Sequence, residues 1–86
     1  MFEIQATSII SKLLERKKQN NIDVVIVDFI LFEINSMLES LNTRIVIFPN
    51  YPKIVIDAWD FDDELGLELL RLYKIYQKIT NEWQQY

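Results

Sequence analysis

The sequence contains no cysteine and no histidine, and each absence excludes a class of protein. Without cysteine the chain has no disulfides, which are the usual support of small secreted domains. Without either residue it has no ligands of the kind that structural zinc sites use. The most frequent general base and the strongest side-chain nucleophile are missing as well. The composition therefore favours a protein that is not an enzyme and has no cofactor.

Glycine and proline are scarce, with one glycine, Gly66, and two prolines, Pro49 and Pro52. A single glycine excludes a glycine-rich loop of the kind that cradles phosphate groups. Half of the residues are hydrophobic, which is typical of an ordered globular chain and not of a disordered one. Its 86 residues are expected to form a single domain that spans residues 1–86.

Long hydrophobic runs are absent too. The longest, Val24 to Val27 and Phe29 to Phe32, are far shorter than the roughly 20 residues that a membrane-spanning helix needs. Near the N-terminus the cations follow the apolar residues, which is the reverse of the order in a secretory signal. These features favour the cytoplasm and no contact with a membrane. Isoleucine is frequent and alanine rare, which inclines the origin toward a microbe or a virus.

Three amphipathic helices are predicted from apolar residues that recur every three or four positions. The first spans about residues 3–19. The second follows Asp23 as its N-cap and continues to Leu41, although the four β-branched residues at 24–27 favour a strand as the alternative. It is apolar around almost its whole circumference, so we expect it to be central and buried. The third runs to Trp83 and carries a heptad seam that consists of Leu65, Leu69, Leu72, Tyr76, Ile79 and Trp83.

Two runs rich in β-branched residues, 44–48 and 53–57, flank the proline-containing stretch 49–52 and predict a β-hairpin. The expected fold is therefore α+β, in the order α-α-β-hairpin-α, with two long amphipathic helices packed together and a two-stranded antiparallel ribbon on one side. Both faces of the ribbon are apolar, and such a small sheet is marginal alone. We therefore expect a homodimer, joined through the third helix or through the hairpin edges.

Aromatic residues at helical spacing are expected in the core and not around a cofactor. They are Phe29, Phe32, Tyr73, Tyr76 and Trp83.

Acidic residues dominate the charge, with 13 Asp and Glu against nine Lys and Arg, and they concentrate between residues 57 and 68. The cluster has three interpretations: carboxylates that cap a helix N-terminus, a recognition surface for a basic partner, or a divalent-metal site at Asp57, Asp60, Asp62 and Asp63 that lacks the glycine of an EF-hand. The predicted partner-binding surface consists of Asp57, Trp59, Asp60, Phe61, Asp62, Asp63 and Glu64.

Two alternatives involve nucleic acid. In the first, a dimeric regulator binds phosphates through the basic face of the first helix, which consists of Lys12, Arg16, Lys17 and Lys18. Against this, the acidic cluster repels nucleic acid. In the second, the chain is a DNA mimic whose carboxylates, Asp28, Glu33 and Glu39 with the 57–68 group, imitate phosphates.

The leading hypothesis is a small acidic, non-enzymatic protein-binding module with a protein partner. A virus- or mobile-element-encoded inhibitor, an immunity protein or an adaptor would each fit this description. The missing catalytic residues and the concentrated acidic and aromatic residues are what favour it.

Overall fold

The computed structural model describes residues 2–18, 24–58 and 64–83. These ranges contain four helices and no strand. The helices are α1 (Phe2–Lys18), α2 (Val24–Thr43), α3 (Tyr51–Ala58) and α4 (Glu64–Trp83). The predicted α+β class and its two-stranded ribbon are therefore wrong, and the described chain is all-helical.

The three helices predicted from apolar spacing are confirmed as α1, α2 and α4. Residues 24–27 belong to α2, so the alternative of a strand at that position is wrong. Asp23, its predicted N-cap, lies outside the described residues. Nowhere in the described ranges is a helix both long enough and apolar enough to cross a lipid bilayer.

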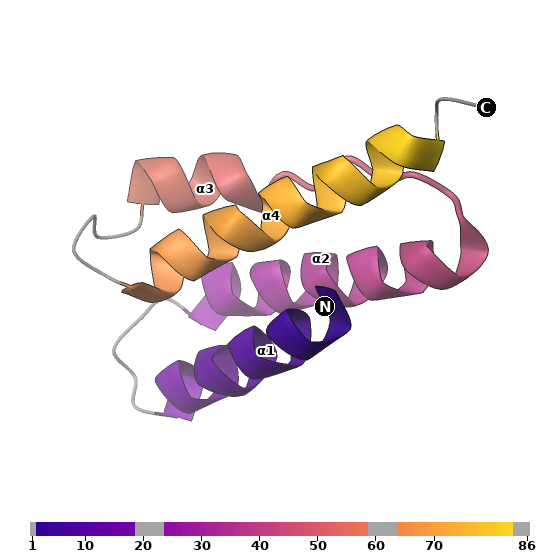
Figure 1. Cartoon of the computed structure of the whole chain (residues 1–86). Coiled ribbons are helices and arrows are strands. Elements are labelled where there is room, and N and C mark those ends of the chain that lie inside the picture. The colour runs from indigo at the N-terminus through magenta and orange to yellow at the C-terminus, as the bar shows by residue number, and fades with distance from the viewer. Residues whose placement is uncertain (1, 19–23, 59–63, 84–86) are drawn as a thin grey trace.

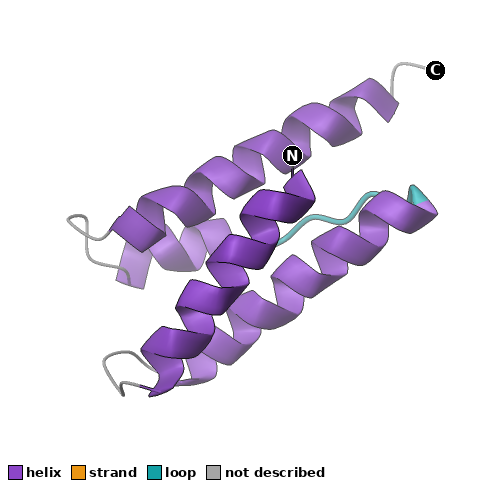
Figure 2. Ribbon diagram, turned by 60° about the horizontal axis from the view of Figure 1, so that its bottom comes forward, coloured by secondary structure: helices purple, strands orange, loops and turns teal. Residues whose placement is uncertain are grey.

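The helices pack into an elongated body with principal extents of 44 × 21 × 20 Å. Helix α1 lies across both α2 and α4, and α3 packs beside α4 and touches α2 (Figures 1 and 2). The two long helices α2 and α4 are thus joined by α1 on one side and by α3 with the segment before it on the other. The core consists of Phe2, Ala6, Ile9, Leu13, Val27, Ile30, Ile34, Met37, Tyr51, Val55, Leu65, Leu69, Leu72 and Tyr76.

Four of the six residues of the heptad seam of α4 are buried inside this one chain, while Ile79 and Trp83 are half-buried. Leu65, Leu69, Leu72 and Tyr76 are each at most 3% exposed, because α1 and α3 cover them. The seam was one of the two surfaces predicted to join a homodimer, and the hairpin edges were the other. Neither surface is present in the predicted form, while dimerisation itself stays a prediction.

The first predicted strand, 44–48, fails at its first residue. Arg44 has a φ of 60°, and its N–H donates to the carbonyl of Ser40 at 2.8 Å. This is the left-handed C-cap that ends many helices, normally at glycine. The segment that follows is irregular and lies against the side chains of α2 and α4. Within the described residues no strand lies beside it, so its β-branched residues have no partner for β-pairing.

The second predicted strand, 53–57, is helical because a distant carboxylate caps it. Glu33, buried in α2, accepts the backbone N–H of Asn50 at 2.8 and 2.9 Å and also that of Tyr51. These are two of the N–H groups that a helix N-terminus leaves without an internal acceptor. Pro52 then lies in the first turn, where proline is tolerated. A contact between α2 and α3 overrides the β-propensity of this short segment.

Candidate functional site

The predicted acidic surface is described only at its two ends. Asp57 is exposed in the last turn of α3, and Glu64 is exposed in the first turn of α4. Trp59, Asp60, Phe61, Asp62 and Asp63 lie outside the described residues. Glu64 occupies the position where the helix dipole favours an anion, as the capping interpretation expects. Among the residues that the structure describes, no group of three or more His, Cys, Asp or Glu side chains could hold a metal ion.

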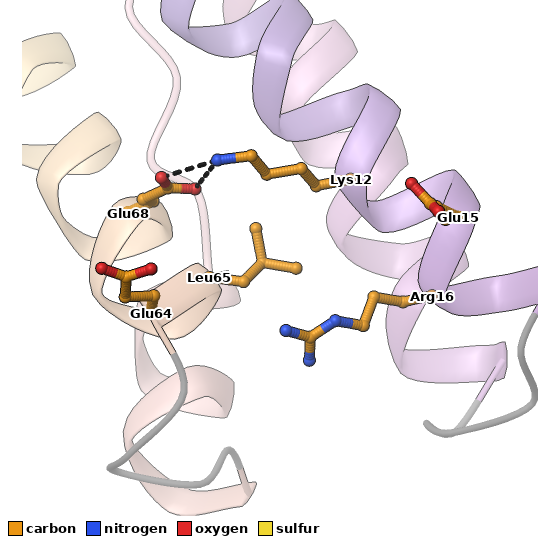
Figure 3. A pocket seen from close by; sticks show the side chains of 6 residues that line it. All are labelled: Lys12, Glu15, Arg16, Glu64, Leu65 and Glu68. Atoms are coloured by element: carbon orange, nitrogen blue, oxygen red, sulfur yellow. Dashed lines mark hydrogen bonds and ion pairs between the residues drawn. The ribbon is translucent and has the colours of Figure 1, made fainter.

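The predicted basic face of α1 lies next to carboxylates from two other helices. Lys12 contacts both carboxylate oxygens of Glu68 at 2.8 and 2.9 Å (Figure 3). Lys17 contacts Asp28 at 2.7 Å. Such exposed pairs contribute little stability. They do, however, place an anion beside each of these two lysines, which weakens the positive field that a phosphate backbone would meet.

Arg16 shares a cleft with residues from both predicted surfaces. The cleft, about 250 Å³ in volume, lies between α1 and the start of α4 (Figure 3). Its lining residues are Lys12, Glu15, Arg16, Glu64, Leu65 and Glu68. The structure thus joins Lys12 and Arg16 of the basic face to Glu64 of the acidic surface. Lys18, the last of the four predicted cations, is exposed at the end of α1. This cleft has mixed charge, and it is not a uniformly basic patch.

The DNA-mimic interpretation depends on carboxylates that the structure uses elsewhere. Glu33 is buried and caps α3. Asp28 and Glu68 are in ion pairs with lysines. Since a mimic needs accessible carboxylates along one surface, these three positions count against it. Glu39 remains exposed on α2.

The outer face of α2 is an exposed apolar surface, which was not predicted from the sequence. Phe32 is 69% exposed, Val25 is 76% exposed, and Phe29 lies between them at 37%. The prediction that α2 is buried all round is therefore wrong, and so is the prediction of core positions for Phe29 and Phe32. The three residues are spaced by four and three, so they form one row along the helix. We call this row the α2 apolar face.

A signal for this face was present in the sequence. An apolar circumference fits a buried helix, but it fits equally a helix with one apolar side against the core and another toward a partner. The buried side of α2 carries Val27, Ile30, Ile34 and Met37. Only the packing of α1 and α4 decides which of the two sides is covered.

The buried polar groups of the protein serve its structure. The Tyr51 hydroxyl donates to the carbonyl of Leu69 at 2.7 Å. Burial, the charge of Glu33 and the neighbouring Tyr73 raise the pKa of Tyr51 far above its usual value. The hydroxyl therefore stays protonated at neutral pH and is not a general base.

A comparison of this chain with family models, with curated proteins and with solved structures finds no match. No relative therefore lends it a function, and the proposal depends on the residues of the chain itself.

Proposed function

We propose that this protein acts by binding another protein, without catalysis, and that the α2 apolar face is its main contact surface. The observation that carries the proposal is the exposure of Val25, Phe29 and Phe32 in one row on one helix. Contiguous apolar surface on a small soluble domain is typical of an interaction site. Phenylalanine is also among the aromatic residues that are enriched at protein interfaces.

Charge indicates the chemistry of the partner. From Val24 to Thr43 the helix contains Asp28, Glu33 and Glu39 and no lysine or arginine. Asp28 is one turn from Phe32, and Glu39 is two turns from it. Complementary charge favours a partner whose apolar residues are flanked by lysine or arginine. An amphipathic basic helix meets both requirements, because its apolar stripe packs along the row and its cations reach exposed Glu39 and the half-exposed Asp28, which is paired with Lys17.

The acidic surface at residues 57 and 59–64 remains part of the proposal as a second contact. Helix α2 begins at the end of the molecule where α3 ends and α4 begins (Figure 1). Asp57 and Glu64 therefore add negative charge at that end. An inhibitor, an immunity protein and an adaptor would each act through such a surface. The proposed partner is a protein, because the ion pairs of Lys12 and Lys17 disfavour the alternative of a nucleic-acid-binding regulator.

The test is affinity capture from a lysate of the source cells with wild type and two matched variants. Phe32→Asp places a charge in the α2 apolar face, while Ile4→Asp makes the same kind of change at a 72% exposed position of α1. We expect Phe32→Asp to reduce recovery of the captured protein at least tenfold, because central aromatic residues dominate binding energy. Ile4→Asp should recover it as wild type does.

A further variant tests the second contact, the acidic surface. A double variant, Asp57→Lys with Glu64→Lys, measures the acidic end separately, and we expect a smaller loss that is strongest at low salt. Equal recovery by wild type and folded Phe32→Asp, or no specific protein with any of them, would show that the α2 apolar face is not the binding site.

A further inference from the structure

Residues 45–48 are hydrogen-bonded to the helices along one backbone edge only. The carbonyl of Ile45 accepts the hydroxyl of Ser40 at 2.6 Å. The N–H of Ile47 donates to the Tyr76 hydroxyl at 3.0 Å. Ser40 and Tyr76 are themselves 2.7 Å apart, so together they form one polar anchor between α2 and α4. Backbone groups of residues 45 and 47 thus point to the same side, toward the core.

The side chains of the segment divide between two grooves. Ile45 and Ile47 border a groove along α2, about 240 Å³ in volume, opposite Ser36 and Glu39. Val46 and Phe48 border a different groove along α4, where Ile47 also contributes. Ile45 thus lies on the α2 side and Val46 and Phe48 on the α4 side, with Ile47 between the two grooves, so the segment runs between these two helices.

The other backbone edge of the segment faces away from the anchor. In an extended chain the N–H and C=O of alternate residues point the same way, so those of Val46 and Phe48 point opposite to those of residues 45 and 47. Within the described residues, no hydrogen bond involves the backbone of Val46 or Phe48. Phe48 is also 79% exposed. An edge of this kind, apolar and rich in β-branched residues, is a template for another strand.

We propose that this edge pairs with the same segment of a second copy of the chain, in antiparallel orientation about a twofold axis at Ile47. In that register Val46 lies opposite Phe48 of the second copy, and Phe48 lies opposite its Val46. Directly opposed residues of this type exchange two hydrogen bonds per pair. The two pairs therefore make four bonds, and they use the N–H and C=O groups that face away from each core.

The side chains fit the same register. Opposed residues of an antiparallel pair share a face, so each Val46 packs on a Phe48, and the two Ile47 side chains meet on the other face. Pairs between aromatic and β-branched residues are among the stabilising ones. Each Phe48 thereby loses most of its contact with water.

Charge favours this contact over one between two α2 helices. Arg44 is the only charged residue between positions 44 and 50, so no like charges meet between the paired residues 45–48 of the two copies. In a contact between two α2 helices, the exposed Glu39 of each copy would find no cation on the helix of the other, because α2 contains none. The second copy therefore occupies the segment 44–50 and leaves the α2 apolar face open.

This contact is independent of the proposed partner binding, and it gives the dimer two α2 apolar faces. A dimer of this form can bind two sites on one target, with the gain in avidity that linked sites provide.

Sedimentation equilibrium of the purified chain tests the proposal, with Phe48→Asp and Phe32→Asp as a matched pair. Both substitutions replace an exposed phenylalanine by aspartate, one at the proposed edge and one on α2. Between about 1 μM and 1 mM, the range of weak to moderate association, wild type and Phe32→Asp should approach twice the chain mass of 10.3 kDa. Phe48→Asp should stay at the mass of one chain, with the helical circular dichroism of wild type.

Amide hydrogen exchange of wild type provides a second readout that needs no variant. Exchange at Val46 and Phe48 should slow at least tenfold as concentration rises, because those N–H groups become bonded only in the dimer. Exchange at Ile47, already bonded to Tyr76, should change little. A wild type that stays monomeric up to 1 mM overturns the proposal. So does a dimer that Phe32→Asp disrupts, or one in which Val46 and Phe48 exchange as fast as in the monomer.

Discussion

Removal of the buried Glu33 carboxylate should lower the free energy of unfolding by several kcal/mol. This side chain belongs to α2 and accepts hydrogen bonds from the backbone at the N-terminus of α3. Its two oxygens lie 2.8 and 2.9 Å from the N–H of Asn50, and it accepts the N–H of Tyr51 as well. Hydrogen bonds to a charged group contribute about 1.5–3 kcal/mol each. Glu33→Ala removes the acceptor of both N–H groups and leaves that of Tyr51 buried without one, so we expect a loss of about 2–4 kcal/mol.

A conservative substitution at the same position separates the effect of the negative charge on stability from the effect of side-chain shape. Glu33→Gln keeps the length of the side chain and one accepting oxygen, so we expect a loss of only about 1–2 kcal/mol. For a domain of this size each kcal/mol lowers the melting temperature by about 4–8 °C. Urea unfolding followed by circular dichroism measures both losses.

Glu39→Gln is the matched control, because it makes the same change on the same helix at an exposed residue. It should alter stability by less than about 0.5 kcal/mol. Amide exchange at Tyr51 should accelerate in Glu33→Ala and not in Glu39→Gln. If Glu33→Gln and Glu33→Ala were both as stable as Glu39→Gln, the carboxylate would not be what holds α3 as a helix.

Two further outcomes follow from single side chains. The raised pKa of Tyr51 means that the folded state keeps a proton that the unfolded state loses above about pH 10. The contribution of this group to the free energy of unfolding is therefore complete below that pH and is lost as the pH rises from there toward the folded pKa. Between pH 8 and 11, the free energy of unfolding should fall more steeply in wild type than in Tyr51→Phe. Arg44 has a left-handed backbone, which costs a residue other than glycine about 1–2 kcal/mol, so Arg44→Gly removes this cost. The same substitution removes a guanidinium that lies 5.5 Å from the centroid of the Trp83 ring, a contact that stabilises the fold by about 0.5–1 kcal/mol. Thermal melts should therefore place Arg44→Gly at or slightly above wild type and Arg44→Ala below it, and the reverse order would contradict this assignment.

The periodic parts of the sequence determined their own structure. In α1, α2 and α4 an apolar residue returns every three or four positions over about 17 to 20 residues. A pattern repeated over so many turns specifies helix because only that period places the residues on one side. The first four positions of the α4 seam reach the core for the same reason, namely Leu65, Leu69, Leu72 and Tyr76, whereas Ile79 and Trp83 are half-buried.

Short segments without such repetition were decided by tertiary contacts. The eight residues of α3 are rich in β-branched side chains, and so short a segment is compatible with both the helical and the strand period. It is helical because Glu33 accepts the N–H groups of Asn50 and Tyr51. Residues 44–48 have the composition of a strand, but no strand lies beside them in the described part of the chain. The left-handed Arg44 changes the direction of the chain, and the residues after it are hydrogen-bonded to the hydroxyls of Ser40 and Tyr76.

The candidate site shows the same division between sequence and structure. The sequence alone located acid at residues 57–68 and cations on α1, because charge is a property of each residue. Which charges meet depends on the packing, which places Glu68 beside Lys12 and Asp28 beside Lys17. The sequence also showed that α2 is apolar on two sides, but the packing decides which side the neighbouring helices cover and therefore that Phe32 is exposed.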